Sequence, residues 1–218
     1  MIPLQFALRR RMMMAGSGGA PISELPLGTL INVGTDGGNG TPNYEIADKA
    51  NLVSGGVVLV RKNIYSESVI NSNSHSNYPN STLDNKMTSI YDSLAERLQS
   101  KIMDATFSLY GSGSITRKVF ALTYTMVGFG ANQGTTEGKA LQYYTSNAKR
   151  IKKYKGKADN WWLASRLDKS FSRRVNVDGT LSNPVSSNSY GVVPAFIIPS
   201  KISYDPTPNT DGSYNLIL

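Results

Sequence analysis

Two short basic stretches hold the densest concentration of chemically active side chains in this sequence. Nine of the 23 Lys and Arg residues lie in these stretches, and the other 14 nearly balance the 15 Asp and Glu residues. The net charge of +8 is therefore local rather than spread along the chain. The first stretch consists of Arg9, Arg10 and Arg11, and the second of Lys149, Arg150, Lys152, Lys153, Lys155 and Lys157.

The second stretch predicts one of two kinds of surface. It forms either an electrostatic surface for an anionic partner (nucleic acid, a teichoic acid or an acidic neighbouring subunit) or a solvated face that keeps the protein soluble. Tyr143, Tyr144 and Tyr154 flank it, and aromatic rings beside basic groups suit stacking on sugars or bases. Tyr is also common on ordinary sheet surfaces, so both interpretations stay open. Nucleic acid is not an expected partner.

Residues for nucleophilic or metal-dependent catalysis are few. The chain contains no Cys and one histidine, His75, within the Ser- and Asn-rich residues 66–80. A catalytic triad needs a base beside its nucleophile, and a phosphate loop needs a Gly-rich motif followed by Lys and Ser or Thr. Neither pattern occurs, and the Gly-rich residues 35–40 contain one Asp, which is too few for a calcium loop. We therefore expect no enzyme activity, no cofactor and no metal site.

The composition indicates a loop-rich protein with β-strands. Apolar residues make up 39% of the chain and charged residues only 17%, with Ser, Asn, Thr and Gly supplying much of the remainder. No segment approaches the ~18–20 apolar residues of a membrane-spanning helix. Arg9, Arg10 and Arg11 interrupt the apolar N-terminal residues, whereas the apolar region of a signal peptide is unbroken. We expect no membrane insertion and no cleaved signal.

Hydrophobic patterns predict the elements that position these residues. Alternating or β-branched apolar residues predict strands over residues 27–33, 44–47, 57–62 and 119–127. Apolar residues three and four apart from Leu83 to Leu109 predict one or two amphipathic helices. Ser81 followed by Asp84 resembles a capping box at their start. The pair Asp178-Gly179 predicts a hairpin with a type I′ turn.

Both tryptophans lie in one predicted strand, residues 160–165 (Asn-Trp-Trp-Leu-Ala-Ser). Residues 191–198 form a nearly unbroken apolar segment that predicts a buried partner strand. Adjacent strand residues point to opposite faces, and aromatic side chains bury the largest areas. We therefore expect Trp161, Trp162 and Phe196 to form the core rather than to contact a ligand.

The first 20 residues predict an arm that docks on a neighbouring subunit. Ile2, Leu4, Phe6 and Leu8 alternate, three arginines follow, and residues 15–20 form a flexible Gly/Ser-rich hinge. The expected assembly contacts are Phe6, Arg9, Arg10 and Arg11, and a disordered tail is the alternative. The chain then divides into an arm (1–20), one α+β domain (21–203) and an extended tail (204–218) that is either a second arm or a terminal strand.

The order of these motifs resembles an uncharacterised domain family common in tailed phages and prophages of Gram-positive and gut bacteria. Its signature is Trp-Trp-Leu-Arg-Ser-Pro followed by Gly-Val-Arg-Pro-Ala-Phe. Residues 161–166 here read Trp-Trp-Leu-Ala-Ser-Arg, and residues 191–196 read Gly-Val-Val-Pro-Ala-Phe. Ala164, Arg166 and Val193 depart from the signature, so no ligand site is carried over. The family is similar to the C-type-lectin-like fold, which implies twisted antiparallel sheets with an amphipathic helical pair.

The resemblance implies a structural protein of a bacteriophage virion, as a capsid decoration protein, head fibre or tail component. Such a protein is expected as a homo-oligomer among other virion subunits, assembled in the host cytoplasm. The alternative is a receptor-binding adhesin for a host-surface glycan or protein, which predicts exposed aromatic residues beside loops 128–138, 166–172 and 182–190. An enzyme is the remaining alternative and requires acidic or His side chains that converge in a pocket.

Overall fold

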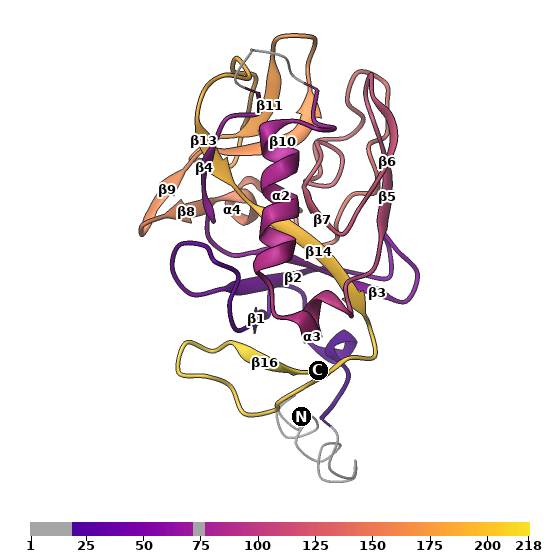
Figure 1. The fold of residues 1–218 in the computed structure, drawn as a ribbon, viewed down its shortest axis with the longest axis vertical. Coiled ribbons are helices and arrows are strands. Elements are labelled where there is room, and N and C mark those ends of the chain that lie inside the picture. Colours follow the sequence, from indigo (N-terminus) through magenta and orange to yellow (C-terminus); the bar gives the residue numbers. More distant parts are fainter. Residues whose placement is uncertain (1–18, 72–76) are drawn as a thin grey trace.

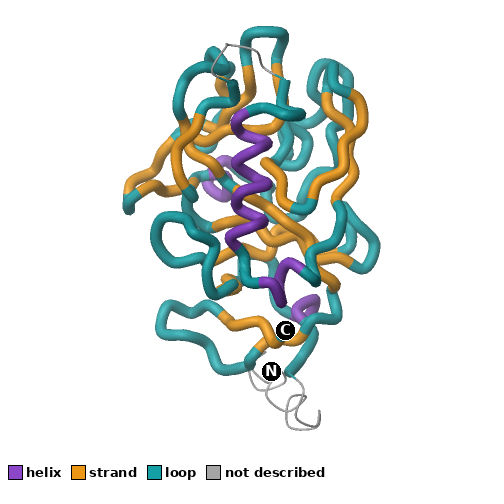
Figure 2. Tube along the Cα trace, viewed as in Figure 1, coloured by secondary structure: helices purple, strands orange, loops and turns teal. Residues whose placement is uncertain are grey.

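The structure, a computed structural model, describes residues 19–71 and 77–218. Strands predominate in this part of the chain and a few helices accompany them, so the fold is α+β (Figure 1). Long loops connect the strands throughout, as the Ser- and Gly-rich composition predicts (Figure 2). Among the described residues, no helix has the length and apolar character needed to cross a membrane.

The larger sheet has seven strands in the described chain and contains the first and last strands. All its neighbouring strands pair antiparallel except β1 and β16, which are parallel. Its order across the sheet is β15 (Ser203–Tyr204), β16 (Tyr214–Ile217), β1 (Leu30–Asn32), β2 (Asn43–Lys49), β3 (Gly56–Arg61), β14 (Pro194–Pro199) and β7 (Val119–Ala121). The predicted strands over residues 27–33, 44–47 and 57–62 are confirmed as β1, β2 and β3.

The smaller sheet carries the two tryptophans. Its five described strands run in the order β12 (Leu181–Ser182), β11 (Ser172–Val175), β10 (Trp161–Arg166), β13 (Tyr190–Val192) and β4 (Ser66–Ser68). Two hairpins project beside the sheets: β5 (Ala105–Leu109) with β6 (Gly113–Arg117), and β8 (Lys152–Tyr154) with β9 (Lys157–Asp159).

The longest helix, α2 (Thr82–Ser93), follows the long axis of the molecule in front of β14 (Figure 1). Its apolar stripe of Leu83, Met87 and Ile90 is buried. The hydroxyl of Ser81 accepts a hydrogen bond from the Asp84 amide at 3.1 Å, which confirms the predicted cap. The other helices are short: α3 (Glu96–Gln99), α4 (Asn147–Arg150) and the 3-10 turn η1 (Ile22–Glu24).

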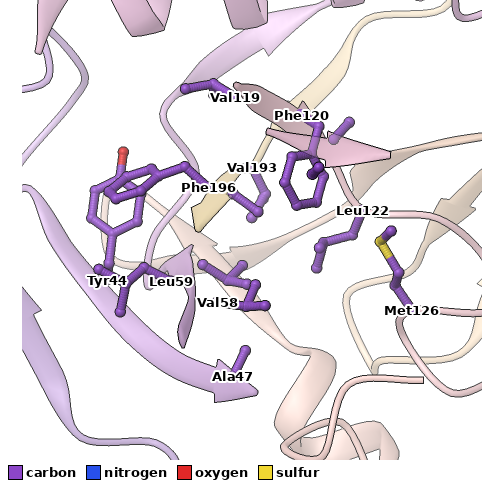
Figure 3. Close-up of a cluster of buried hydrophobic side chains, with 14 of the residues drawn as sticks. Tyr44, Ala47, Val58, Leu59, Val119, Phe120, Leu122, Met126, Val193 and Phe196 are labelled. Carbon is purple, nitrogen blue, oxygen red and sulfur yellow. The ribbon is translucent and has the colours of Figure 1, made fainter. Parts of the chain in front are cut away.

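The core lies between the sheets and α2, and its centre is aromatic. Trp161, Trp162 and Phe196 are completely buried. The ring of Phe196 packs at 4.9 Å from the ring of Tyr44, across strands β14 and β2 (Figure 3). Phe120 on the neighbouring strand β7 belongs to the same cluster (Figure 3).

Residues 191–198 form two strands in two different sheets. β13 runs parallel to β10, with Gly191 opposite Trp161, whereas β14 lies between β3 and β7 in the larger sheet. Val193 separates the two strands, and Pro194 at the start of β14 has no N–H with which to continue the ladder of β13. This segment therefore joins the two sheets, instead of forming the single partner strand that its apolar pattern predicts.

Two predicted boundaries are wrong. The helical pattern stops at Gln99, and residues 105–109 form strand β5, in which Ala105, Phe107 and Leu109 are buried alternately. The strand predicted over residues 119–127 ends at Ala121. The Thr123 hydroxyl then accepts the Met126 amide at 3.1 Å and donates to the Glu137 carbonyl at 2.5 Å. These side-chain bonds hold a turn where the apolar alternation favours a strand.

The predicted hairpin at Asp178-Gly179 forms between β11 and β12, but its turn is not type I′. Only Gly179 has a positive φ, +80°, and the hairpin closes through the Asn176 amide and the Thr180 carbonyl at 2.7 Å. This is a three-residue loop with a left-handed glycine. Any Cβ at position 179 would lie 2.0 Å from the Asn147 carbonyl oxygen, so glycine is required.

Both ends of the described chain lie at one end of the long axis (Figure 1). The tail forms a terminal strand, because β16 pairs with β1. Residues 20 and 21 lie beside β15: Pro21 forms a bridge with Ser203, and the Tyr204 amide donates to the Ala20 carbonyl at 3.2 Å. Residues 204–218 are thus an integral part of the larger sheet. The expected assembly contacts Phe6, Arg9, Arg10 and Arg11 lie outside the described residues, and so does His75.

Candidate functional site

The loops that follow β10 and β12 meet at the end of the molecule opposite the termini (Figure 1). Phe171 forms a bridge with Val185, and the Ser186 amide donates to the Ser170 carbonyl at 3.1 Å. We call residues 166–171, 183–189 and 110–112, with Asn77, the loop pole. It unites two of the three loops that the adhesin interpretation singles out, and its Phe171 is 39% exposed.

Arg166 holds the loop pole together from the end of β10. Its guanidinium donates to the Tyr110 carbonyl at 3.1 Å, the Gly111 carbonyl at 2.7 Å and the Asn77 side-chain oxygen at 2.8 Å. A Cβ at position 111 would lie 1.7 Å from an Arg166 nitrogen, and Gly111 has φ +67°. Arg166 therefore ties the end of β10 to residues 110 and 111 and to Asn77.

A buried polar network supports the loop pole from beneath. Asn132 and Glu137 are completely buried. The Asn132 amide donates to Glu137 Oε1 at 3.0 Å, and its oxygen accepts from Nε of Arg173 at 3.1 Å. Glu137 Oε1 also accepts the Tyr110 amide at 2.9 Å, and Oε2 accepts the Ser165 hydroxyl. Both carboxylate oxygens are therefore occupied, and the network fixes loop 128–138 to β10 and β11 instead of offering a reactive group.

The Asn132–Glu137 network escapes sequence reasoning because its residues are far apart in the chain. A polar loop with one Glu and one Asn carries no signal of burial. Within the described residues, no three His, Asp or Glu side chains are grouped so that they could hold a metal ion.

The second basic stretch is only partly a surface, and the prediction is wrong for Arg150 and Lys152. Lys152 is 1% exposed and forms a buried ion pair with Glu45 at 2.5 Å. Burial by itself would raise the pKa of Glu45, but the ammonium groups of Lys152 and Lys62 outweigh burial and lower that pKa. Arg150 is also buried. Its Nε donates to the Val127 carbonyl at 2.5 Å, and its guanidinium lies 4.2 Å from the Phe129 ring centroid.

The other four lysines remain exposed on α4 and on the β8–β9 hairpin: Lys149, Lys153, Lys155 and Lys157. The hairpin turns at Lys155-Gly156, where both residues have positive φ, 48° and 84°, as a type I′ turn requires. Lys149 lies 4.9 Å from the Tyr143 ring centroid, and Lys155 lies 5.1 Å from that of Tyr154. The exposed cluster is therefore smaller than the sequence predicts, and its own lysines contact two of the three flanking tyrosines, Tyr143 and Tyr154.

We expect Arg166→Ala to loosen the loop pole without unfolding the domain. The substitution removes the three charge-assisted hydrogen bonds that the Arg166 guanidinium donates. We therefore expect the free energy of unfolding to fall by about 1–3 kcal/mol. Amide hydrogen exchange should accelerate at residues 110–112, while β2 and β3 stay protected. Lys169→Ala, an exposed neighbour in the same loop, is the matched control. Unchanged exchange at residues 110–112 would show that Arg166 is not the brace.

Comparison with known proteins gives one finding. A family model described as a domain of unknown function, DUF6273, matches residues 54–200. This range includes the two tryptophans, the whole smaller sheet and the residues of the loop pole. No curated protein and no solved structure gives a significant match.

Proposed function

Since the chain belongs to the DUF6273 family, whose description assigns no activity, we propose a function from the placement of its surfaces. It is a structural protein of a bacteriophage virion, anchored to neighbouring subunits through residues 1–20 and projecting the loop pole outward. Its domain is a C-type-lectin-like variant of the α+β fold. The role is in binding and assembly, without catalysis.

One observation carries this proposal: the anchor point and the loop pole lie at opposite ends of the long axis (Figure 1). A Cβ at Gly19, the first described residue, would lie 3.1 Å from Ile217 Cδ1, so the arm leaves the domain beside the last strand. A subunit attached there presents its braced loops away from the particle. The resemblance of residues 161–166 and 191–196 to a phage family supports the same assignment.

The C-type-lectin-like assignment rests on three features of the fold. The first and last strands, β1 and β16, are neighbours in one sheet. Between them the chain forms the second sheet and the loop pole, and returns to the larger sheet through residues 191–199. A helical pair, α2 and α3, packs beside the larger sheet, as the resemblance implies.

Deleting residues 1–20 should leave a folded domain that no longer enters particles. Of this region the structure describes Gly19 and Ala20, and the Ala20 carbonyl accepts a hydrogen bond from the Tyr204 amide of β15 at 3.2 Å. The test is gradient-purified particles from cells that express tagged full-length or shortened chain, with circular dichroism of each isolated protein. A full-length chain with Phe6→Ala and all three arginines replaced by Gln is the matched variant. Incorporation of the shortened chain at full occupancy would overturn the proposed arm.

The second candidate, an adhesin, is favoured by the exposed Phe171 of the loop pole. The same particles distinguish it. Particles that incorporate Phe171→Ala normally but adsorb poorly to host cells identify the loop pole as a receptor-binding surface. Particles that adsorb normally limit the loop pole to a structural role.

A further inference from the structure

Arg174 lies in an aromatic stack on one face of the smaller sheet. It is paired with Trp162 on β10 and with Ser182 on β12, so the three side chains share that face. The guanidinium carbon of Arg174 lies 4.2 Å from the Tyr190 ring centroid. The Tyr190 ring in turn packs edge-on against Trp162 at 5.0 Å. The buried tryptophan therefore supports the tyrosine, and the tyrosine supports the guanidinium.

The Nε–H of Arg174 is buried and has no hydrogen-bond acceptor among the described residues. No ion pair involves Arg174 in that part of the chain either. Five other arginines each donate through Nε to a protein oxygen: Arg61, Arg117, Arg150, Arg166 and Arg173. A buried charged donor without an acceptor is costly and rare. The stack on Tyr190 accounts for the position of Arg174, but no acceptor in the described chain accounts for its Nε–H.

We propose that Arg174 binds the carboxylate of an acidic ligand, with the Tyr190 ring as its platform. The guanidinium is planar and donates two parallel hydrogen bonds to a carboxylate, so an acceptor can enter in the plane of the guanidinium. Ser182 lies beside it on β12, and the Asn188 amide bonds the Tyr190 hydroxyl at 3.3 Å, which holds the ring in place. An aromatic ring with hydroxyl and amide groups around a guanidinium suits an acidic sugar.

This site differs in kind from the exposed lysines of the β8–β9 hairpin, because it rests on one half-buried arginine rather than on summed charge. It is also independent of the proposed virion role, since it requires only the folded domain. A failure of the arm in the particle experiment would leave it untouched.

The test is a titration of the ¹⁵N-labelled full chain with sodium glucuronate, followed through the Nε–H signals of its arginines. Glucose at the same concentrations is the neutral control, and sodium chloride keeps the ionic strength constant. We expect the Arg174 signal to shift saturably with glucuronate, with a Kd of roughly millimolar order for one charge-assisted contact. Glucose should produce no saturable shift. A linear drift shared by all arginines would be an ionic-strength effect and would overturn the site.

Matched variants locate the binding. Arg174→Gln and Arg174→Lys should weaken glucuronate binding at least tenfold, whereas Arg97→Gln, at an exposed arginine of α3, should leave it unchanged. Tyr190→Phe keeps the aromatic ring beside Arg174, so this variant should still bind glucuronate, whereas Tyr190→Leu should not. Tighter binding of inorganic phosphate than of glucuronate would overturn the carboxylate assignment. If Arg174→Gln does not fold, the comparison of glucuronate with glucose on the unmodified chain decides alone.

Discussion

Replacing Trp161 with alanine should destabilise the domain by about 3–5 kcal/mol, the usual cost of truncating a buried aromatic residue. Trp161 is completely buried, lies opposite Gly191 where β10 meets β13, and donates its indole N–H to the Arg150 carbonyl at 2.9 Å. Alanine therefore leaves a cavity and also leaves a buried carbonyl without its donor. Urea unfolding followed by circular dichroism measures the change.

Two further variants separate packing from hydrogen bonding at this position. Trp161→Phe keeps most of the apolar volume and loses the indole N–H, so its cost should lie clearly below that of alanine. Phe171→Ala, at an exposed aromatic residue, should change stability by no more than about 0.5 kcal/mol. Equal costs for Trp161→Ala and Phe171→Ala would mean that the Trp-Trp strand is not the centre of the core.

Arg61→Met should cost a similar amount, about 3–5 kcal/mol, because it leaves a buried carboxylate without its cation. The guanidinium of Arg61 and the carboxylate of Asp36 form a two-pronged ion pair, at 2.6 and 3.2 Å, with side chains 0% and 1% exposed. Arg61 also donates to the Asn39, Asn63 and Ile64 carbonyls. One side chain thus fixes the Gly-rich turn at residues 35–40 to strand β3.

The neighbouring residue provides the control for Arg61. Lys62 bonds Glu45 at 2.7 Å, but its side chain is 46% exposed and Glu45 keeps Lys152 as a second cation. Lys62→Met should therefore cost about 1 kcal/mol or less. The double variant Arg61→Met with Asp36→Asn should recover part of the loss, since no uncompensated charge stays buried. No recovery would show that Arg61 acts through its carbonyl contacts rather than through Asp36.

The strands and the core of the larger sheet could be predicted because their signals are local. Residues 57–60 (Val-Val-Leu-Val) are apolar throughout and mostly β-branched, and they lie in the central strand β3. The Ser81 cap and the start of α2 depend on residues three apart, and both are found where the pattern places them. The burial of Trp161 and Trp162 is also a local signal, because an exposed strand with two adjacent indoles would present a large apolar surface to water.

The loop pole and the fate of the basic stretch could not be predicted, because they depend on partners distant in sequence. Lys152 is buried by Glu45, 107 residues away, and Arg173 reaches Asn132 across 41 residues. A run of lysines looks the same whether or not one of them points inward. The error at residues 105–109 has a different origin: Ala105 and Leu109 are four apart and fit a helix, while Phe107 between them fits a strand.

The parallel pairing of β1 with β16 also sets the order in which this chain can be completed. Ile31 lies opposite Tyr214, so β1 obtains its second neighbour only after residue 214 has been synthesised. Until then one side of β1 presents unpaired N–H and C=O groups, a template for association with other chains. Contacts of such long sequence separation also slow folding. Completion of β1 therefore depends on residues 214–217, and a nascent chain interrupted before β16 leaves that edge open to association with other chains.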